Sequence, residues 1–125
     1  MNRYLRLFRF GNGLMGAVGV LIAAFIAGGY EAADHWPNLI AGVFVILSFV
    51  AGGNALNDYI DRDLDKTAHP DRPLPTGELQ PATAKYCGVG GLVLAVLLSF
   101  LISWIVAAVV AAAAVLMVSY ETLLK

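Results

Sequence analysis

Charge is the scarcest property of this chain. Only 14% of its 125 residues are Asp, Glu, Lys or Arg, whereas about 25% is usual for a soluble domain. The mean hydropathy is +0.74. Three runs contain no charged residue at all, namely residues 10–30, 37–57 and 86–120. Because a membrane-spanning helix needs about 20 such residues, the composition predicts an all-α, multispanning membrane protein.

The third uncharged run is too long for one span. Its 35 residues would form a helix of about 52 Å, against a hydrocarbon core of roughly 30 Å. We expect a break near Ser103 and Trp104, where a polar residue adjoins an aromatic residue that favours the membrane interface. The expected fold is therefore a single membrane domain, residues 1–125, with four transmembrane helices at about 11–30, 38–62, 81–102 and 105–122, and a loop at about 61–80.

Other features are also scarce or missing. The single cysteine, Cys87, excludes an internal disulfide, and its place near the start of the third helix predicts a small buried residue. The chain has no nucleophile elbow, no phosphate-cradling glycine loop and no zinc signature. A formal net charge of −1 gives no support to a nucleic acid partner.

The basic residues indicate how the chain crosses the membrane. In a four-helix arrangement all eight Lys and Arg residues fall on one side. The positive-inside rule assigns that side to the cytoplasm. We therefore expect a multi-pass protein of the cell membrane with both termini and the charged loop in the cytoplasm.

The charge that is present gathers in one segment, since seven charged residues lie within residues 58–71. No Gly or Pro interrupts residues 57–65, so the second helix can continue through them. At about 100° per residue, positions four apart are displaced by only about 40° around a helix. Asn57, Asp61 and Asp65 are therefore predicted to form one stripe.

One amide and several carboxylates on one face suit Mg²⁺, which takes one or two carboxylates and fills its other positions with water and phosphate oxygens. Asn54 and Asp58 lie on the same side of the helix, and Asp63 points away. A calcium loop is excluded because Lys66 stands at its required Gly position and Arg72 at its required Glu position. A solvated acidic face is the alternative that the spacing leaves open.

The loop that follows is rich in proline and is expected to be stiff and ordered. It presents Arg72, a planar fork for phosphate oxygens, opposite the acidic stripe, with Lys66 as a second cation. Carboxylates with a metal on one wall and cations on the other are what a diphosphate leaving group requires. Alternatively, Arg72 pairs with Asp71, Asp63 or lipid headgroups.

Two motifs resemble those of the UbiA superfamily of intramembrane prenyltransferases. Residues 57–65 read NDYIDRDLD and fit its Asp-rich motif NDxxDxxxD, and residues 72–77 read RPLPTG and are similar to its RP-(I/L)-P-(S/T)-G. The resemblance implies an all-helical fold that binds an isoprenyl diphosphate through Mg²⁺ and ionises it. An acceptor then attacks the allylic cation while the isoprenyl tail lies in an apolar tunnel.

The resemblance also implies roles for individual residues. The implied metal ligands are Asn57, Asp58, Asp61 and Asp65, and the implied catalytic set is Asn57, Asp61 and Asp65. Diphosphate contacts are expected from Arg72, Lys66, Lys125 and Asn12. Asn12 fits an Arg-Pro-x-Asn motif of the first helix, here reading RFGN. Lys125 belongs to a Tyr-x-x-x-Lys region from which it departs by one position.

Within the superfamily, residues 6–17 and 51–62 look most like the archaeal digeranylgeranylglyceryl phosphate synthases. That likeness implies transfer from geranylgeranyl diphosphate to geranylgeranylglyceryl phosphate, in archaeal ether-lipid synthesis. The alternatives are a branch with a quinone or chlorophyll-type acceptor, and a non-enzymatic membrane-assembly or cation-binding module. A CDP-alcohol phosphotransferase is disfavoured because the Asp-Gly…Ala-Arg pattern is missing.

The resemblance covers only the family's N-terminal half. Family members have about nine spans and a second Asp-rich motif, whereas no Asp follows Asp71 here. We therefore expect a truncated enzyme that does not turn over alone.

Overall fold

The structure is a computed structural model, and it describes residues 1–124. Its elements, in chain order, are α1 (Arg3–Phe8), α2 (Phe10–Gly28), the 3₁₀-helix η1 (Gly29–His35), α3 (Trp36–Ile60), α4 (Arg62–Ala68), α5 (Pro81–Ser99), α6 (Trp104–Ser119) and the π-helical turn η2 (Tyr120–Leu124). No strand occurs in this part of the chain, so the all-α prediction is confirmed.

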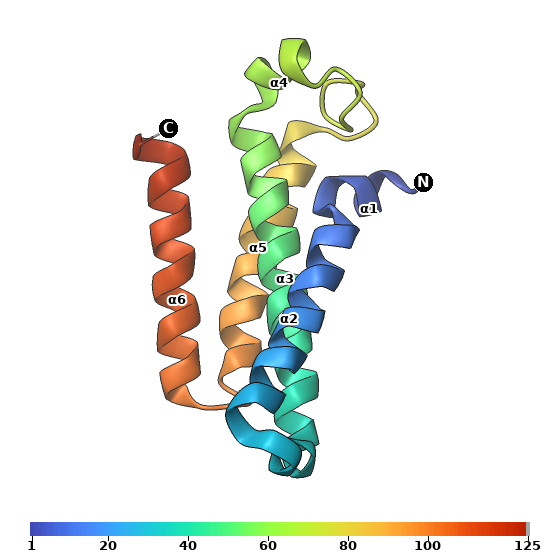
Figure 1. Ribbon diagram of the computed structural model, residues 1–125. Helices are drawn as coiled ribbons and strands as arrows, with labels where there is room; N and C mark the ends of the chain where they lie inside the picture. Colours follow the sequence, from blue (N-terminus) through green and yellow to red (C-terminus); the bar gives the residue numbers. More distant parts are fainter. Residues whose placement is uncertain (125) are drawn as a thin grey trace.

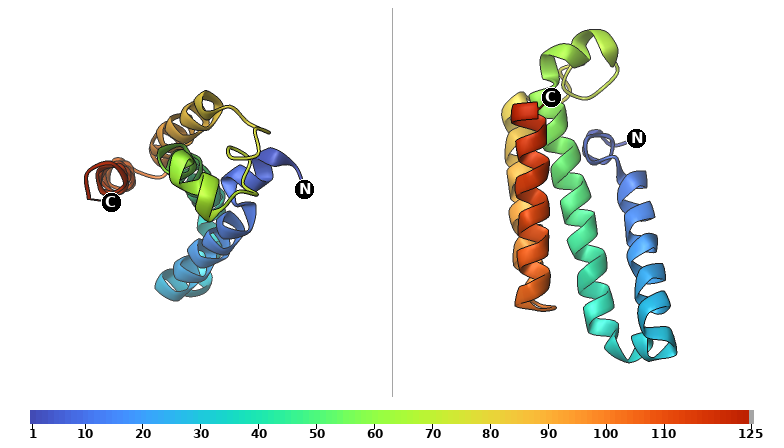
Figure 2. Two further views of the ribbon diagram at one scale, coloured as in Figure 1. Left: turned by 90° about the horizontal axis from the view of Figure 1, so that it is seen from above. Right: turned by 60° about the vertical axis from the view of Figure 1, so that its left-hand side comes forward.

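Four long helices run side by side, and α3 lies at their centre (Figure 1). α3 packs against α2 on one side and against α5 on the other, and α6 packs against α5. α2 and α3 form an antiparallel pair joined at η1 (Figure 2). The N-terminus, α4 and the end of α6 all lie at the opposite end from η1 (Figure 1).

Three helical segments are long and apolar enough to cross a membrane, namely Phe10–Ile60, Pro81–Ser99 and Trp104–Leu124. The chain is thus a membrane helical protein, as predicted. The first segment contains both α2 and α3, which fold back on each other at η1. If α2 and α3 each cross the membrane, the crossings number four, as the sequence predicts. This number stays a prediction.

The expected break in the third apolar run is present between α5 and α6. Ser103 has an extended backbone, and its hydroxyl accepts a hydrogen bond from the Val106 N–H at 3.1 Å. A serine at this position satisfies a backbone donor that the first turn of α6 cannot pair. The cap explains how the helix restarts without a Gly or Pro.

α3 ends at Ile60, close to its predicted end at 62, and the short helix α4 follows after Asp61. Asp61 N–H donates to the Asn57 carbonyl at 2.9 Å and Asp65 N–H to the Asp61 carbonyl at 2.8 Å, so helical bonding runs from α3 into α4. The loop therefore begins near His69 rather than at 61. His69, which precedes Pro70, has left the helical conformation, with φ −141° and ψ 65°.

The helix α1 was not predicted, since six residues are too few to show a periodic pattern. The Asn2 side chain caps it by accepting from the Tyr4 N–H at 2.8 Å. It ends at Arg9, whose φ of 48° is the only positive value at a non-glycine residue of the described chain.

Leu7 of α1 is fully buried in a cluster that also holds Ala55, Leu79 and Ala84. Cys87 packs against this cluster and is half-buried, more exposed than predicted.

α3 and α5 touch through glycines. A Cβ built on Gly52 would lie 2.7 Å from the Leu92 nitrogen and 2.8 Å from the Gly88 oxygen, and one on Gly91 would lie 2.7 Å from the Gly52 Cα. These are distances that real Cβ atoms do not reach, so only glycine allows the two backbones to approach this closely.

We expect Gly52→Ala to destabilise the helix bundle by about 1–3 kcal/mol, because α3 and α5 must move apart. The measurement is the melting temperature in detergent. Gly90→Ala is the matched control, since a Cβ there meets nothing within 4 Å, and alanine favours helix. Equal melting temperatures for the two variants would contradict the close helix contact.

Candidate functional site

The acidic end of α3, the helix α4, the loop 69–80 and the helix α1 meet at one end of the bundle (Figures 1 and 2). Exposure varies along the acidic segment. Asn57 and Asp61 are half-buried, Asp58 and Asp65 are buried, and Asp63 is exposed. The acidic run is therefore not a uniformly solvated face.

Arg72 reaches from the loop onto two buried carboxylates. Its Nη1 lies 2.6 Å from Asp65 Oδ2 and 3.4 Å from Asp58 Oδ1. The two acidic side chains are only 4% and 2% exposed. The structure thus places Arg72 over the acids, as predicted, and its partners are neither Asp71 nor Asp63. The guanidinium neutralises charge that burial would otherwise make costly.

Arg9 is a member of the site that sequence reasoning did not include. Its Nη2 lies 2.8 Å from Asp58 Oδ1, so two guanidinium groups share this carboxylate. Arg9 stands 49 residues before Asp58, and no local spacing connects them. The one feature of the sequence that could have indicated Arg9 as a site residue is its place in the Arg-x-x-Asn sequence of residues 9–12.

Asn54 and Asn57, predicted on the same side of the helix, differ in their surroundings. Asn54 donates from its side chain to the Phe8 carbonyl at 3.0 Å, and so holds α3 against α1. Asn57 lines a cavity of about 330 Å³ together with Arg9 and Glu121. Glu121 lies in η2 and was not predicted as a site residue.

Lys66 lies away from the acidic stripe. Its Nζ is 2.9 Å from Asp63 Oδ1, and these side chains are 67% and 77% exposed. This ammonium lowers the pKa of the Asp63 carboxyl, mainly through the hydrogen bond between them. The structure therefore does not bring Lys66 to the carboxylates held by Arg72.

The remaining diphosphate contacts expected from the sequence are Asn12 and Lys125. Asn12 lines a cavity of about 440 Å³ that Arg6, Arg9 and Arg72 also line. The structure thus brings Asn12 and Arg72 together. Lys125 lies outside the described residues.

Residues 1–124 hold no group of three His, Cys, Asp or Glu side chains placed to bind a metal ion. Asn57, Asp61 and Asp65 nevertheless offer hard oxygen atoms across the junction of α3 and α4. For Mg²⁺ one or two carboxylates suffice where phosphate oxygens supply other ligands. The donor set therefore fits a cation that arrives with a phosphate anion, and not one held by these side chains alone.

An apolar groove of about 620 Å³ runs between α3, α5 and α6. It begins at Leu56, Tyr59 and Ile60, within a helical turn of Asn57, and it continues along α5 from Lys85 to Leu97. Twelve residues of helix correspond to about 18 Å. Apart from Lys85, Tyr59 and two hydroxyl side chains of the last helical turns, its walls are aliphatic, so the groove can accept a long hydrocarbon chain. Leu56, Tyr59 and Ile60 lie on another face of α3 than Asn57 and Asp61.

Several proteins named "Digeranylgeranylglyceryl phosphate synthase" are similar to this chain. The Metallosphaera sedula protein is 34% identical over 100% of the chain, the Natronomonas pharaonis protein 36% over 97%, and the Methanothermobacter thermautotrophicus protein 31% over 100%. In each case the match covers 43% of the relative. The chain thus spans less than half the length of these relatives. No solved structure matches the chain.

The sequence model of the UbiA prenyltransferase family matches residues 14–125. This range contains the acidic stripe, the Arg72 loop and all three walls of the apolar groove. The resemblance first noted in residues 57–65 and 72–77 is thereby confirmed. The chain belongs to the UbiA prenyltransferase family.

Proposed function

We propose that this chain forms the diphosphate-binding part of an enzyme that transfers an isoprenyl group to a lipid acceptor. The observation that carries the proposal is the place of Arg72 over two buried acids at the end of α3, a helix that also lines an apolar groove about 18 Å long. An isoprenyl diphosphate has the matching form, a head with several negative charges on a long hydrocarbon tail. The names of the relatives favour geranylgeranyl diphosphate as donor and geranylgeranylglyceryl phosphate as acceptor, in archaeal ether-lipid synthesis.

The proposed site holds the head of the donor between carboxylates and arginine. Mg²⁺, held by Asn57, Asp61 and Asp65 with Asp58 assisting, would neutralise charge on the leaving diphosphate. The guanidinium of Arg72 has five donors in a planar fork, so it can bind phosphate oxygens while it retains a contact with a carboxylate. Asn12 lines the cavity on the other side of Arg72.

The apolar groove would hold the tail and exclude water from the reacting carbon. In the transfer, the C–O bond of the donor breaks and the diphosphate leaves with the electron pair. The acceptor hydroxyl then attacks the allylic carbon and loses its proton. Breaking the C–O bond leaves an allylic cation on the isoprenyl group. Aliphatic walls keep water away from this cation, which water would otherwise attack.

The proposed arrangement in the cell membrane has four crossings, with both termini and the acidic end in the cytoplasm. Both ends of the described chain and α4 lie at the same end of the bundle, opposite η1 (Figure 1). Basic residues gather at that end too, including Arg6, Arg9 and Arg72. Such an asymmetry is typical of a cytoplasmic face.

We expect Asp61→Asn and Asp65→Asn each to weaken Mg²⁺-dependent binding of geranylgeranyl diphosphate by about 10- to 100-fold, because each removes a charged oxygen ligand. The measurement is titration calorimetry on the full chain in detergent. Asp63→Asn is the matched control, since Asp63 is exposed on the opposite face. A non-enzymatic module would show no binding of the diphosphate by the unsubstituted protein.

Arg72→Lys is expected to reduce affinity for the diphosphate by about 10-fold, because lysine keeps the charge but loses the two-pronged donor geometry. Lys66→Ala should leave the affinity unchanged, since the Lys66 ammonium bonds Asp63 on the solvent side. Equal losses in both variants would show that general positive charge, and not the guanidinium fork, binds the diphosphate.

The 125-residue chain is expected to bind the donor without transferring it. Ala107 is the only buried residue of α6, so one wall of the groove has little support behind it. The measurement is transfer of radiolabelled geranylgeranyl groups to geranylgeranylglyceryl phosphate in detergent or vesicles. Mg²⁺-dependent turnover by the purified chain would refute this expectation.

A further inference from the structure

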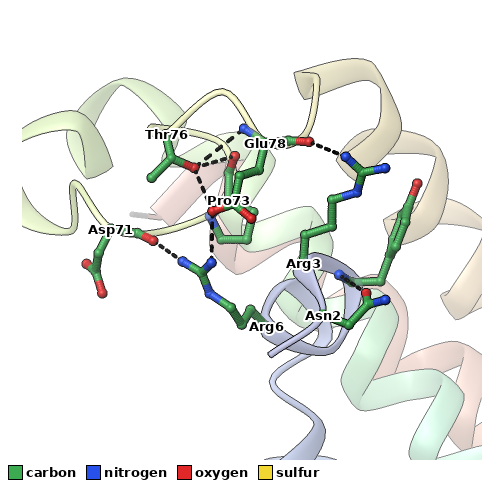
Figure 3. A network of polar contacts seen from close by, with 8 residues as sticks. Asn2, Arg3, Arg6, Asp71, Pro73, Thr76 and Glu78 are labelled. Carbon is green, nitrogen blue, oxygen red and sulfur yellow. Dashed lines mark hydrogen bonds and ion pairs between the residues drawn. The ribbon is translucent and has the colours of Figure 1, made fainter.

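The helix α1 and the residue that ends it carry three arginines, spaced by three residues, that connect separate parts of the site. Arg3 Nη1 donates to the Glu78 carbonyl at 3.2 Å, and Arg6 Nη1 lies 2.8 Å from Glu78 Oε1. Arg6 also donates through Nη2 to the Asp71 carbonyl oxygen (Figure 3). Arg9 pairs with Asp58 of α3. One short helical segment thus contacts both the loop and the helix that the loop covers.

Glu78 is the point at which the loop is held. Its carboxylate accepts from Arg6, and its Oε1 lies 3.2 Å from the Thr76 hydroxyl (Figure 3). The same hydroxyl lies 3.2 Å from the Pro73 carbonyl oxygen, so its one proton serves either acceptor. Arg6 therefore contacts the loop at Asp71 and at Glu78, on both sides of the turn between them.

The loop between these two contacts is closed on itself. Thr76 N–H donates to the Arg72 carbonyl and Leu79 N–H to the Pro73 carbonyl, both at 3.1 Å. Prolines within the turn further restrict its backbone. A displacement at Glu78 is therefore transmitted to Arg72 and is not absorbed by the intervening residues.

The core fixes where α1 lies relative to the loop. Leu7 of α1 and Leu79 of the loop are buried in the same cluster, together with Ala55 of α3 and Ala84 of α5. Leu79 adjoins Glu78, and Leu7 adjoins Arg6. The ion pair between Arg6 and Glu78 thus connects two backbones that are already held by their apolar neighbours, so its formation costs little further backbone entropy.

We propose that Arg6 and Glu78 are positioning residues, whose ion pair, with the contact of Arg6 to Asp71, holds the loop so that Arg72 stays over Asp58 and Asp65. Neither residue touches the acidic stripe. Each acts on Arg72 through the backbone that carries it. Arg6 also lines the cavity that Asn12 and Arg72 line, so the place of Arg72 has to be measured without ligand. The effect on diphosphate binding rests on the function proposed above, whereas the effect on the place of Arg72 does not.

The test compares Arg6→Glu, Glu78→Arg and the double charge swap Arg6→Glu/Glu78→Arg in the full chain. The first measurement needs no ligand and follows the rate at which phenylglyoxal modifies the Arg72 guanidinium, by mass spectrometry. The second is the Kd for geranylgeranyl diphosphate with Mg²⁺. Asp63→Lys is the matched control, since it reverses one charge of another ion pair, that with Lys66, on the exposed side of α4.

Each single variant is expected to speed modification of Arg72 and to raise the Kd by about 10-fold, the effect of losing a hydrogen-bonded ion pair. The double swap should restore most of both changes, because the pair re-forms with its charges exchanged. Rescue should be incomplete, because a glutamate at position 6 cannot donate to the Asp71 carbonyl oxygen. Asp63→Lys should change neither. Rescue by the swap separates positioning from a general loss of stability, which two substitutions would increase.

Three results would overturn the proposal. They are an unchanged rate of Arg72 modification in the single variants, faster modification with an unchanged Kd, and failure of the swap to restore either value even in part. If the original protein does not bind the diphosphate, the proposed function fails by itself. The modification rates then still decide whether Arg6 and Glu78 hold Arg72 in place.

Discussion

The burial of two carboxylates at the junction of α3 and α4 constrains the rest of this end of the molecule. Leaving either charge buried without a partner would cost roughly 3–5 kcal/mol. Asp65 is compensated by Arg72, and Asp58 by Arg72 and Arg9. These arginines come from the loop and from the N-terminal segment. Both segments must therefore fold against the end of α3 for the buried acids to be stable.

The pairing of Arg9 with Asp58 also depends on the backbone conformation of Arg9. Arg9 adopts a left-handed conformation at the end of α1, which costs about 1–2 kcal/mol for a residue with a side chain. The turn allows α1 to lie across the bundle end while α2 descends along α3, and it directs the Arg9 guanidinium to Asp58. Close packing of α3 on α5 at Gly52 and Gly91 then fixes the groove wall relative to the acidic stripe.

This arrangement separates two tasks that an intramembrane prenyltransferase must combine. Charged and amide groups, drawn from α1, the α3–α4 junction and the loop, gather where an anionic head would bind. The aliphatic groove begins within one helical turn of Asn57 and leads away along α5. Membership of the UbiA family agrees with this division, although the chain spans 43% of the length of its first relatives.

The sequence by itself determined the apolar helices, the break at Ser103, the stripe of Asn57, Asp61 and Asp65, and the family. Each depends on local chemistry: run length, a capping hydroxyl, helical periodicity or a contiguous motif. Only the tertiary structure decided the helix α1, the pairing of Arg9 with Asp58 and the outward direction of Lys66. Those features depend on contacts between residues far apart in the chain, or on the rotation of α4 about its axis, and both are set by how the helices pack.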